Sequence, residues 1–270
     1  KSSPSYTPYY RVWNGSGWAP EQAATTFGSG NGIQWLVLAP KNGSQEIMLA
    51  AKTDTNDIYA QAWSGSAWGS VTTIETNAPC SYQCFDLAYE RQSGDGLIVY
   101  REGNVDTPRY RTYSSGSWSS ESSAGDVGAD PAWVRLESDP TGERIMLAVL
   151  DENNDLNVQR WSGSAWGSNS ELENAMESDV TRGFDLAYQA NGTALIEYNE
   201  GGVEFPRYRL YTESTWGSEQ TAWDIDGDIG WVALAANSTG NDIFSLIVDN
   251  ENNELFLHKW DGYRWTEGEL

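Results

Sequence analysis

Short apolar stretches alternate with polar turns along almost the whole chain. One such stretch covers residues 35–39, a turn rich in Asn, Gly and Ser follows at residues 41–44, and a second apolar stretch covers residues 47–51. Turn signals recur at spacings of roughly 8–12 residues, and the apolar stretches are rich in β-branched and aromatic residues. Because no stretch of reasonable length has the apolar spacing of a helix, the pattern predicts an all-β chain of short strands.

A motif with two large aromatic residues recurs six times. Its clearest form, Trp-Ser-Gly-Ser-Ala-Trp-Gly-Ser, stands at residues 63–70 and again, unchanged, at residues 161–168. Looser copies that keep an aromatic residue at each end are found at residues 13–18, 113–118, 211–216 and 260–265. Gly, Ser, Asn and Asp between the aromatic residues are typical of tight turns, so each copy predicts an outer β-hairpin.

Between the outer hairpins lie inner strand pairs that define a double repeat. The inner pairs begin at Trp35, Phe85, Trp133, Phe184 and Trp231. The three tryptophans are 98 residues apart and the two phenylalanines 99, so two kinds of four-strand unit alternate. Four-strand units of about 50 residues are typical of propeller blades. The sequence therefore predicts a six-bladed β-propeller built from three two-blade repeats of about 98 residues.

The predicted blades leave the first one incomplete. After a polar lead-in at residues 1–8, a single propeller domain is predicted for residues 9–270. It consists of an outer hairpin at 9–26 and blades at about 33–76, 83–124, 131–174, 183–223 and 230–270. The inner hairpin of the first blade is missing from this sequence. We therefore expect a fragment of a longer protein, a blade completed by self-association or by a donor hairpin, or a gap with exposed strand edges.

Composition narrows the range of partners. The 39 acidic and 16 basic residues give a net charge of −23, which argues against nucleic acid and anionic membrane surfaces because both bind clustered Lys and Arg. No apolar run is long enough to insert into a membrane. The 14 Trp and 27 Gly, with few Lys, indicate an extracellular protein, secreted or on the cell surface. Cys80 and Cys84 are close in sequence and predict a short-loop disulfide in an oxidising compartment.

One position of the predicted outer hairpins always carries a long hydrogen-bonding side chain. It lies two residues before the opening aromatic residue of the motif and is occupied by Arg11, Gln61, Arg111, Gln159, Arg209 and His258. One interpretation is a ring of ligand sites between blades, since such side chains bind hydroxyl or carboxylate groups. The other is structural: the same side chains tie neighbouring blades together through buried carboxylates such as Asp86 and Asp185.

The closing tryptophans of the motif and the acidic turns allow similar alternatives. We expect most of these tryptophans to be core wedges between blades, and any exposed ring to be a sugar-binding candidate. They are Trp18, Trp68, Trp118, Trp166, Trp216 and Trp265. Three equivalent turns are acidic, and in one of them Asp151, Asn153 and Asp155 offer oxygen ligands for Ca²⁺. Asp and Asn are also ordinary turn residues, so no cofactor is expected beyond this weak calcium candidate.

Catalytic motifs are not found. The sequence has no nucleophile elbow and no Walker loop, and its lone histidine, His258, excludes a histidine-rich metal centre. A glycoside hydrolase would need two opposed carboxylates, a condition that 39 acidic residues meet too easily to be informative. The sequence therefore predicts a protein that is not an enzyme.

With these residues placed, the chain resembles the Trp-rich six-bladed propeller lectins, of which the fungal fucose-binding lectins are an example. The resemblance rests on the repeat length, the Trp-containing turn and the Arg-bearing strand. It implies sugar sites between blades, each with an Arg, an acid or amide, and an aromatic residue. The matching sets are Arg111 with Glu102 and Trp118, and Arg209 with Glu200 and Trp216, while Arg11 and Trp18 match in part. Three blades depart from this pattern, with Gln or His in place of Arg.

The resulting hypothesis is an extracellular, non-enzymatic propeller that binds glycans or a protein partner. The alternative is a structural or surface-display domain, such as a cell-surface or filament subunit, that presents a rigid acidic disc. A glycoside hydrolase is the third hypothesis.

Overall fold

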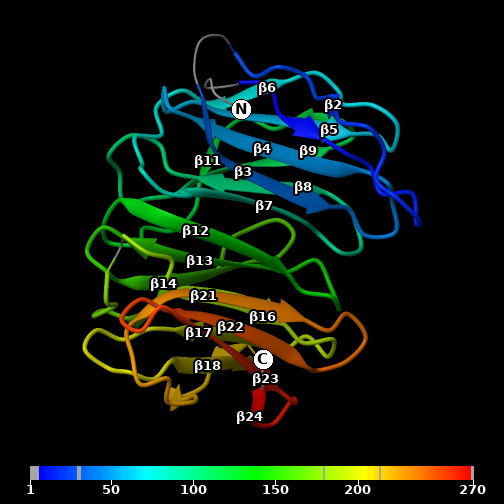
Figure 1. Cartoon of the computed structure of the whole chain (residues 1–270). Coiled ribbons are helices and arrows are strands. Elements are labelled where there is room, and N and C mark those ends of the chain that lie inside the picture. The colour runs from blue at the N-terminus through cyan, green and yellow to red at the C-terminus, as the bar shows by residue number, and fades with distance from the viewer. Residues whose placement is uncertain (1–5, 29–31, 179, 213, 269–270) are drawn as a thin grey trace.

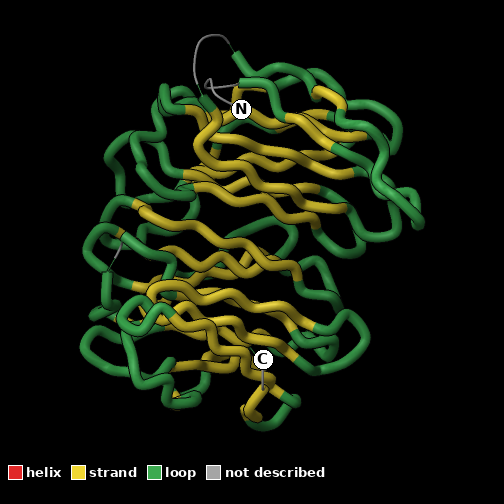
Figure 2. Tube along the Cα trace, in the orientation of Figure 1, coloured by secondary structure: helices red, strands yellow, loops and turns green. Residues whose placement is uncertain are grey.

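The structure is a computed structural model that describes residues 6–28, 32–178, 180–212 and 214–268. These residues form antiparallel β-sheets and contain no helix (Figure 2). Successive strands pair with each other in each sheet, except that β11 pairs with β9 and β20 with β18. The sheets lie one behind another like the blades of a propeller (Figure 1). This arrangement confirms the predicted all-β propeller.

The strands are grouped into one half-blade and five blades. The half-blade has β1 (Tyr9–Tyr10) and β2 (Gln22–Ala23). The second blade has β3 (Ile33–Pro40), β4 (Ile47–Thr53), β5 (Ile58–Trp63) and β6 (Thr72–Glu75). The third has β7 (Phe85–Tyr89), β8 (Gly96–Tyr100), β9 (Arg109–Ser114), β10 (Ser117–Trp118) and β11 (Ser122–Ser123).

The remaining three blades repeat the same two designs. The fourth has β12 (Pro131–Ser138), β13 (Ile145–Asp151), β14 (Leu156–Trp161) and β15 (Ser170–Glu173). The fifth has β16 (Phe184–Tyr188), β17 (Ala194–Tyr198), β18 (Arg207–Thr212), β19 (Thr215–Trp216) and β20 (Gln220–Thr221). The sixth has β21 (Ile229–Ala236), β22 (Ile243–Asp249), β23 (Glu254–Trp260) and β24 (Trp265–Gly268).

The aromatic motif closes the outer hairpin of each blade with one of two turns. In the even blades its two tryptophans pair across the hairpin, as Trp63 and Trp68 do with ring centroids 5.5 Å apart. Gly65 between them has a φ of 97°, which disfavours any side chain there. In the third blade Ser115 and Gly116 have φ values of 51° and 81°, the two positive values of a type I′ turn. The half-blade shares the turn of the even blades, since Trp13 pairs with Trp18 and Gly15 has a φ of 96°.

Apolar cores lie between the blades, and inner strands of consecutive blades pack side by side from β3 through β7, β12 and β16 to β21. At the centre, Trp133 contacts Trp35 and Trp231 edge-to-face, each at 5.4 Å, so the innermost strands of the three even blades meet there. The blades are thus held by interfaces whose side chains come from segments far apart in the sequence.

The expectation that most closing tryptophans are core wedges holds in part. Trp18 is 65% exposed, and the other five are only half-buried, packing against the edges of the cores. The fully buried tryptophans are instead Trp133 near the axis and the opening residues Trp161 and Trp260. Both opening residues pack against the preceding blade, Trp161 with Ala88 and Leu97, and Trp260 with Ala187 and Leu195.

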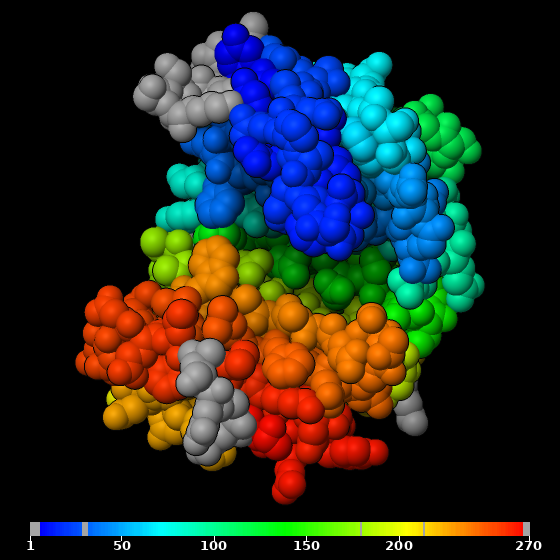
Figure 3. All heavy atoms as spheres, turned by 45° about the vertical axis from the view of Figure 1, so that its right-hand side comes forward, coloured from blue at the N-terminus to red at the C-terminus, as the bar shows by residue number. Residues whose placement is uncertain are grey.

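The first blade consists of β1 and β2 alone among the described residues, as the sequence predicts. In Figure 3 a hollow separates the blue N-terminal segments from the orange strands of the sixth blade, with green atoms of the middle of the chain at its floor. The structure therefore has an open place where an inner hairpin of the first blade would stand.

Candidate functional site

Two pockets lie at equivalent places in successive repeats. The first, of about 720 Å³, lies between the second and third blades, and the second, of about 540 Å³, between the fourth and fifth. Both volumes are in the range of small-molecule sites. The side chains at matching positions of the two linings are Gln61 and Gln159, Arg111 and Arg209, Tyr113 and Tyr211, and Trp118 and Trp216.

The arginine of the first pocket belongs to a fixed set of three residues. Arg111 on β9 donates from Nε to the hydroxyl oxygen of Tyr100 (3.3 Å), at the end of β8. Tyr100 in turn donates its hydroxyl hydrogen to Glu121 Oε2 (2.7 Å). Burial raises the pKa of Tyr100, so its hydroxyl stays protonated and can donate. One edge of the guanidinium is therefore held in place at the pocket wall.

The second pocket repeats this set. Arg209 donates from Nε to the hydroxyl oxygen of Tyr198 (3.0 Å), and Tyr198 donates to Glu219 Oε2 (2.8 Å). Arg209 Nη2 also donates to the backbone carbonyl of Leu172 (2.9 Å) on the facing blade. Burial raises the pKa of Tyr198, as it does for Tyr100. The recurrence of the whole set in two repeats shows that it belongs to this blade type.

An aromatic pair stands beside each arginine. Tyr113 and Trp118 lie across the outer hairpin of the third blade with centroids 5.0 Å apart, and Tyr211 and Trp216 do the same in the fifth at 5.1 Å. All four rings are half-buried. Each pocket thus combines a charged donor, a carboxylate close behind it and partly exposed aromatic surface.

The rest of the lining differs between the pockets. Glu46, Trp63 and Trp68 border the first pocket. Arg160 and Glu171 border the second, and Arg160 lies over the ring of Tyr211 at 5.6 Å from its centroid. The shared residues define a common site, while these differences give each pocket its own charge distribution.

The glutamines and the histidine of the predicted ring tie blades together. Gln159 exchanges two hydrogen bonds with the backbone of Gly125, at 2.7 and 2.8 Å, and Gln61 Nε2 donates to the carbonyl of Thr25 (3.4 Å). Thr25 and Gly125 follow the outer hairpin of the preceding blade. His258 is buried against Trp223, at the corresponding place, and burial lowers its pKa. The structural interpretation therefore describes these three residues, although the glutamines also border the pockets.

Other sequence-based expectations need correction. Glu102 pairs with Arg109 (2.6 Å) and Glu200 with Arg207 (2.7 Å), whereas Arg111 and Arg209 are linked through their tyrosines to Glu121 and Glu219. Sequence reasoning missed both of these acids and both tyrosines. The signal was present, because Tyr100 and Tyr198, like Glu121 and Glu219, are 98 residues apart.

The third copy of the site is incomplete. Arg11 and Trp18 of the half-blade stand at the positions of Arg111 and Trp118, and both are exposed. The tyrosine of the set comes from β8 or β17 in the complete blades, and no described strand takes that place beside β1. The structure therefore assembles two of the three sets that the sequence suggests.

The calcium candidates form a closed turn. Asp151 is buried, and its Oδ1 accepts the backbone N–H groups of Asn153 (2.9 Å) and Asp155 (3.0 Å). Its Oδ2 accepts from Asn157 Nδ2 (3.3 Å), and burial raises the pKa of Asp151 to about 6. These contacts give Asp151 the role of a turn-stabilising residue.

In the structure Cys80 and Cys84 are joined in a disulfide.

A cluster of three glutamates lies close to the Arg–Tyr–Glu set of the first pocket and includes its Glu121. Glu75, Glu102 and Glu121 each place an oxygen within 4.8 Å of the others. Glu102 already pairs with Arg109, Glu121 accepts from Tyr100, and Glu75 accepts backbone N–H groups of the next two residues. Each of the three carboxylates thus accepts hydrogen bonds from groups of the protein, and Glu102 also has a cationic partner.

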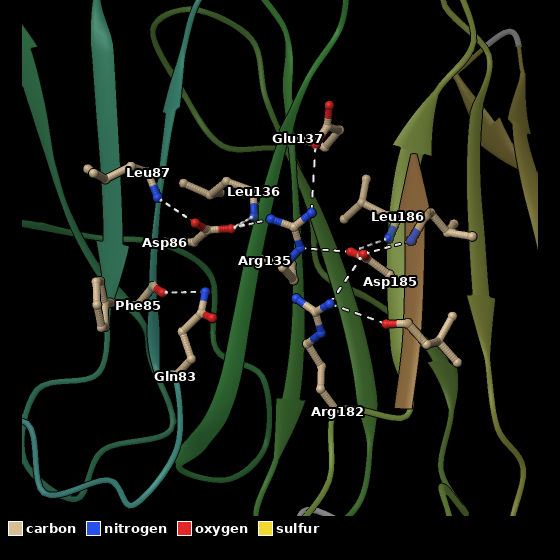
Figure 4. A network of polar contacts seen from close by, with 12 residues as sticks. Gln83, Phe85, Asp86, Leu87, Arg135, Leu136, Glu137, Arg182, Asp185 and Leu186 are labelled. Atoms are coloured by element: carbon tan, nitrogen blue, oxygen red, sulfur yellow. Dashed lines mark hydrogen bonds and ion pairs between the residues drawn. The ribbon is translucent and has the colours of Figure 1, made fainter. Parts of the chain in front are cut away.

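The buried carboxylates Asp86 and Asp185 pair with Arg135 and not with an arginine of the predicted ring. Figure 4 shows Arg135 of β12 between them, at 3.0 Å from Asp86 and 2.7 Å from Asp185. Asp86 also accepts the backbone N–H of Leu136 (2.8 Å), and Asp185 accepts that of Leu234 (3.0 Å). This network near the axis joins the third, fourth, fifth and sixth blades and is separate from the two pockets.

Comparison with solved structures places the fold. The chain is similar to a fungal lectin from Aleuria aurantia, described as a six-bladed β-propeller with a novel fucose recognition mode, at 14% identity and a TM-score of 0.57, over 93% of this chain and 83% of that one. It is similar to the SapL1 lectin in complex with α-methyl fucoside, at 14% identity and a TM-score of 0.58, over 96% of this chain and 86% of that one. It is also similar to the BP39L lectin from Burkholderia pseudomallei, at 12% identity and a TM-score of 0.69, over 96% of this chain and 75% of that one. At these identities the likeness establishes a propeller fold of the kind found in these lectins.

No family model matches the sequence, and neither does any curated protein. Within the described part of the chain, no helix is long and apolar enough to cross a membrane.

Proposed function

We propose that the chain is a non-enzymatic propeller that binds carbohydrate in its two inter-blade pockets. The observation that carries this proposal is the Arg–Tyr–Glu set beside a half-buried Trp in both pockets. A sugar presents hydroxyl groups around a ring with an apolar face. A fixed guanidinium and a carboxylate match the hydroxyls, and an aromatic ring matches the apolar face.

The charge of the protein narrows the type of sugar. A net charge of −23 repels sulfated and other polyanionic glycans, so neutral sugars are the better ligands. The lectins of similar fold include one described by its fucose recognition and one in complex with α-methyl fucoside, which makes fucosides the first compounds to test. The composition and the disulfide support an extracellular setting for such a protein.

Titration calorimetry with the sugars that bind on a glycan array tests the proposal. We expect about two sites per chain, because two pockets carry the complete set. Arg111→Ala and Arg209→Ala should each remove one site, and the double variant should remove both. Arg109→Ala is the matched control, since Arg109 lies on the same strand and pairs with Glu102 outside the pocket lining. Its stoichiometry should stay unchanged.

Two outcomes would favour the other hypotheses. If the folded protein binds nothing on the array, the structural or display role, or a protein partner, replaces the sugar. If it releases the aglycone from aryl glycosides, it is a hydrolase, and the pocket carboxylates become candidate catalytic groups.

A further inference from the structure

The two walls of the open place beside the half-blade expose apolar side chains. On β3 of the second blade, Leu36 is 44% exposed and Leu38 is 54% exposed. On the sixth blade, Phe244 and Leu246 of β22 are 42% and 38% exposed, and Leu255 of β23 is 54% exposed. Figure 3 shows the hollow between these two parts of the chain. Large apolar surfaces of this kind usually mark a binding surface.

The internal repeat shows what covers the first wall elsewhere. Leu36 and Leu38 correspond to Val134 and Leu136 of the fourth blade, which are 1% and 2% exposed. Val134 and Leu136 are covered by the inner hairpin of the third blade, with Ala88, Leu97 and Val99 in the same core. The second blade has the same strand but no such hairpin on that side among the described residues.

The second wall gives the same result. Phe244, Leu246 and Leu255 correspond to Met146, Ala148 and Leu156 of the fourth blade, none more than 1% exposed. Those residues are covered by the inner hairpin of the fifth blade, whose core side chains are Phe184, Leu186, Ile196 and Tyr198. Both walls therefore have the shape of a surface that packs against an inner hairpin of the odd-blade type.

Polar groups at the same place agree with this occupant. In the complete blades, the aspartate of the inner hairpin accepts a backbone N–H of the next blade, as Asp86 does from Leu136 and Asp185 from Leu234. Leu38 stands at the equivalent position of β3. In addition, β8 pairs with β9 and β17 with β18, whereas the corresponding edge of β1 has no strand partner among the described residues.

We propose that this open place is the docking site of one further β-hairpin of the type formed by β7–β8 and β16–β17. Its first strand carries the pattern Phe-Asp-Leu-Ala-Tyr, whose aspartate accepts the N–H of Leu38. Its second strand pairs with β1 on the side opposite β2 and ends in a tyrosine beside Arg11, which completes a third Arg–Tyr–Glu position. A second copy of this chain is a poorer occupant, because its own inner hairpins are buried within its blades. The proposal does not depend on sugar binding.

A peptide taken from the chain itself provides the test. A fluorescently labelled peptide with the sequence of residues 183–199, the inner hairpin of the fifth blade, is titrated into the intact chain and followed by anisotropy. We expect saturable binding of one peptide per chain. Leu38→Lys and Leu246→Lys, one on each wall, should each weaken binding at least about tenfold, since each buries a charge against the peptide. Tyr263→Lys is the matched control, because Tyr263 is 89% exposed and lies in the outer hairpin of the sixth blade.

A covalent version guards against poor folding of the free peptide, since an isolated hairpin is only marginally stable. Residues 182–204 are fused as a second copy in front of residue 7, so that the hairpin meets β1 through the same connection that joins β17 to β18. We expect the melting temperature to rise by several degrees and the amide of Leu38 to gain protection from hydrogen exchange. The proposal is overturned if neither peptide nor fusion protects Leu38. It is equally overturned if the unmodified chain forms a dimer that Leu38→Lys dissociates, because the occupant is then a second copy.

Discussion

The third blade and the half-blade both carry the aromatic motif in an outer hairpin but differ in what lies inside it. In the third blade, Trp118 is half-buried and Arg111 is held by Tyr100. In the half-blade, Trp18 is 65% exposed and Arg11 is exposed. The aromatic motif therefore specifies a turn, whereas burial of its tryptophan and orientation of its arginine come from the inner hairpin.

The same contrast extends to the neighbouring blades. Leu136 and Leu38 occupy one repeat position on the same kind of strand, yet Leu136 is buried beside the complete third blade and Leu38 is exposed beside the half-blade. Equivalence in sequence thus predicts the backbone, and the neighbouring blade decides the burial. The following variants test this difference, from the largest expected effect to the smallest.

Removing a buried carboxylate should open a complete interface. Asp185 pairs with Arg135 and Arg182 and accepts the N–H of Leu234. Asp185→Ala leaves two largely buried cations without their shared anion, so we expect a loss of about 3–5 kcal/mol in the free energy of unfolding. Urea denaturation measures it. Asp54→Ala, at an exposed aspartate, should cost less than about 0.5 kcal/mol. A loss for Asp185→Ala as small as for Asp54→Ala would show that the network contributes nothing to the interface.

Truncating the two equivalent leucines compares the complete and the open interface directly. Leu136→Ala removes buried apolar volume and should cost about 2–4 kcal/mol. Leu38→Ala acts at a side chain that is 54% exposed and should cost less than about 1 kcal/mol. Both values come from urea denaturation, with each variant serving as the control for the other. Equal costs would mean that the wall of the open place is covered in solution.

The repeat made the architecture predictable, because a blade is defined by local strand and turn patterns that recur every 98 residues. It also identified Arg111 and Arg209. Their partners lie elsewhere in the blade, Tyr100 and Tyr198 on the neighbouring strand and Glu121 and Glu219 just before the last strand, and the folded register brings them together.

The network at the axis could not be predicted from the repeat. Arg135 has Val37 and Ala233 at its equivalent positions, so the arginine that joins Asp86 and Asp185 occurs in one repeat of three. The exposure of Trp18 and Leu38 could not be predicted either, since it depends on a strand pair outside their own hairpins. Repetition predicts what the copies share, and these features arise where the copies differ.

A buried acid distinguishes the two complete odd-to-even interfaces. Between the fifth and sixth blades Glu197 accepts a hydrogen bond from Ser245, where the interface of the third and fourth blades has Val99 and Leu147. Burial, with the nearby charge of Asp185, raises the pKa of Glu197 to about 8. The carboxyl group is then protonated in the folded state at neutral pH and ionised in the unfolded chain above about pH 4.5.

Stability should therefore fall as the pH rises from about 4.5 to 8, because the folded state binds the extra proton. Each pH unit in this range lowers the free energy of unfolding by up to about 1.4 kcal/mol. We therefore expect a measurable loss of about 1–3 kcal/mol between pH 5 and pH 7. Glu197→Gln should flatten this part of the profile, as seen by urea denaturation at several pH values. Glu254→Gln, at an exposed glutamate, should leave the profile unchanged. An unaltered slope in Glu197→Gln would assign the pH dependence to other groups.

The smallest predicted effect compares how the outer loops of the half-blade and the third blade are attached. Gln159 exchanges two short hydrogen bonds with Gly125 of the third blade, whereas Gln61 makes one bond of 3.4 Å to Thr25 of the half-blade. Because a net hydrogen bond contributes about 0.5–1.5 kcal/mol, Gln159→Ala should cost about 1–2 kcal/mol and Gln61→Ala about half as much. Hydrogen exchange at the amides of residues 125 and 25 should show the same order. If Gln61→Ala costs as much as Gln159→Ala, the half-blade is attached as firmly as a complete blade, and the difference between them is confined to the missing inner strands.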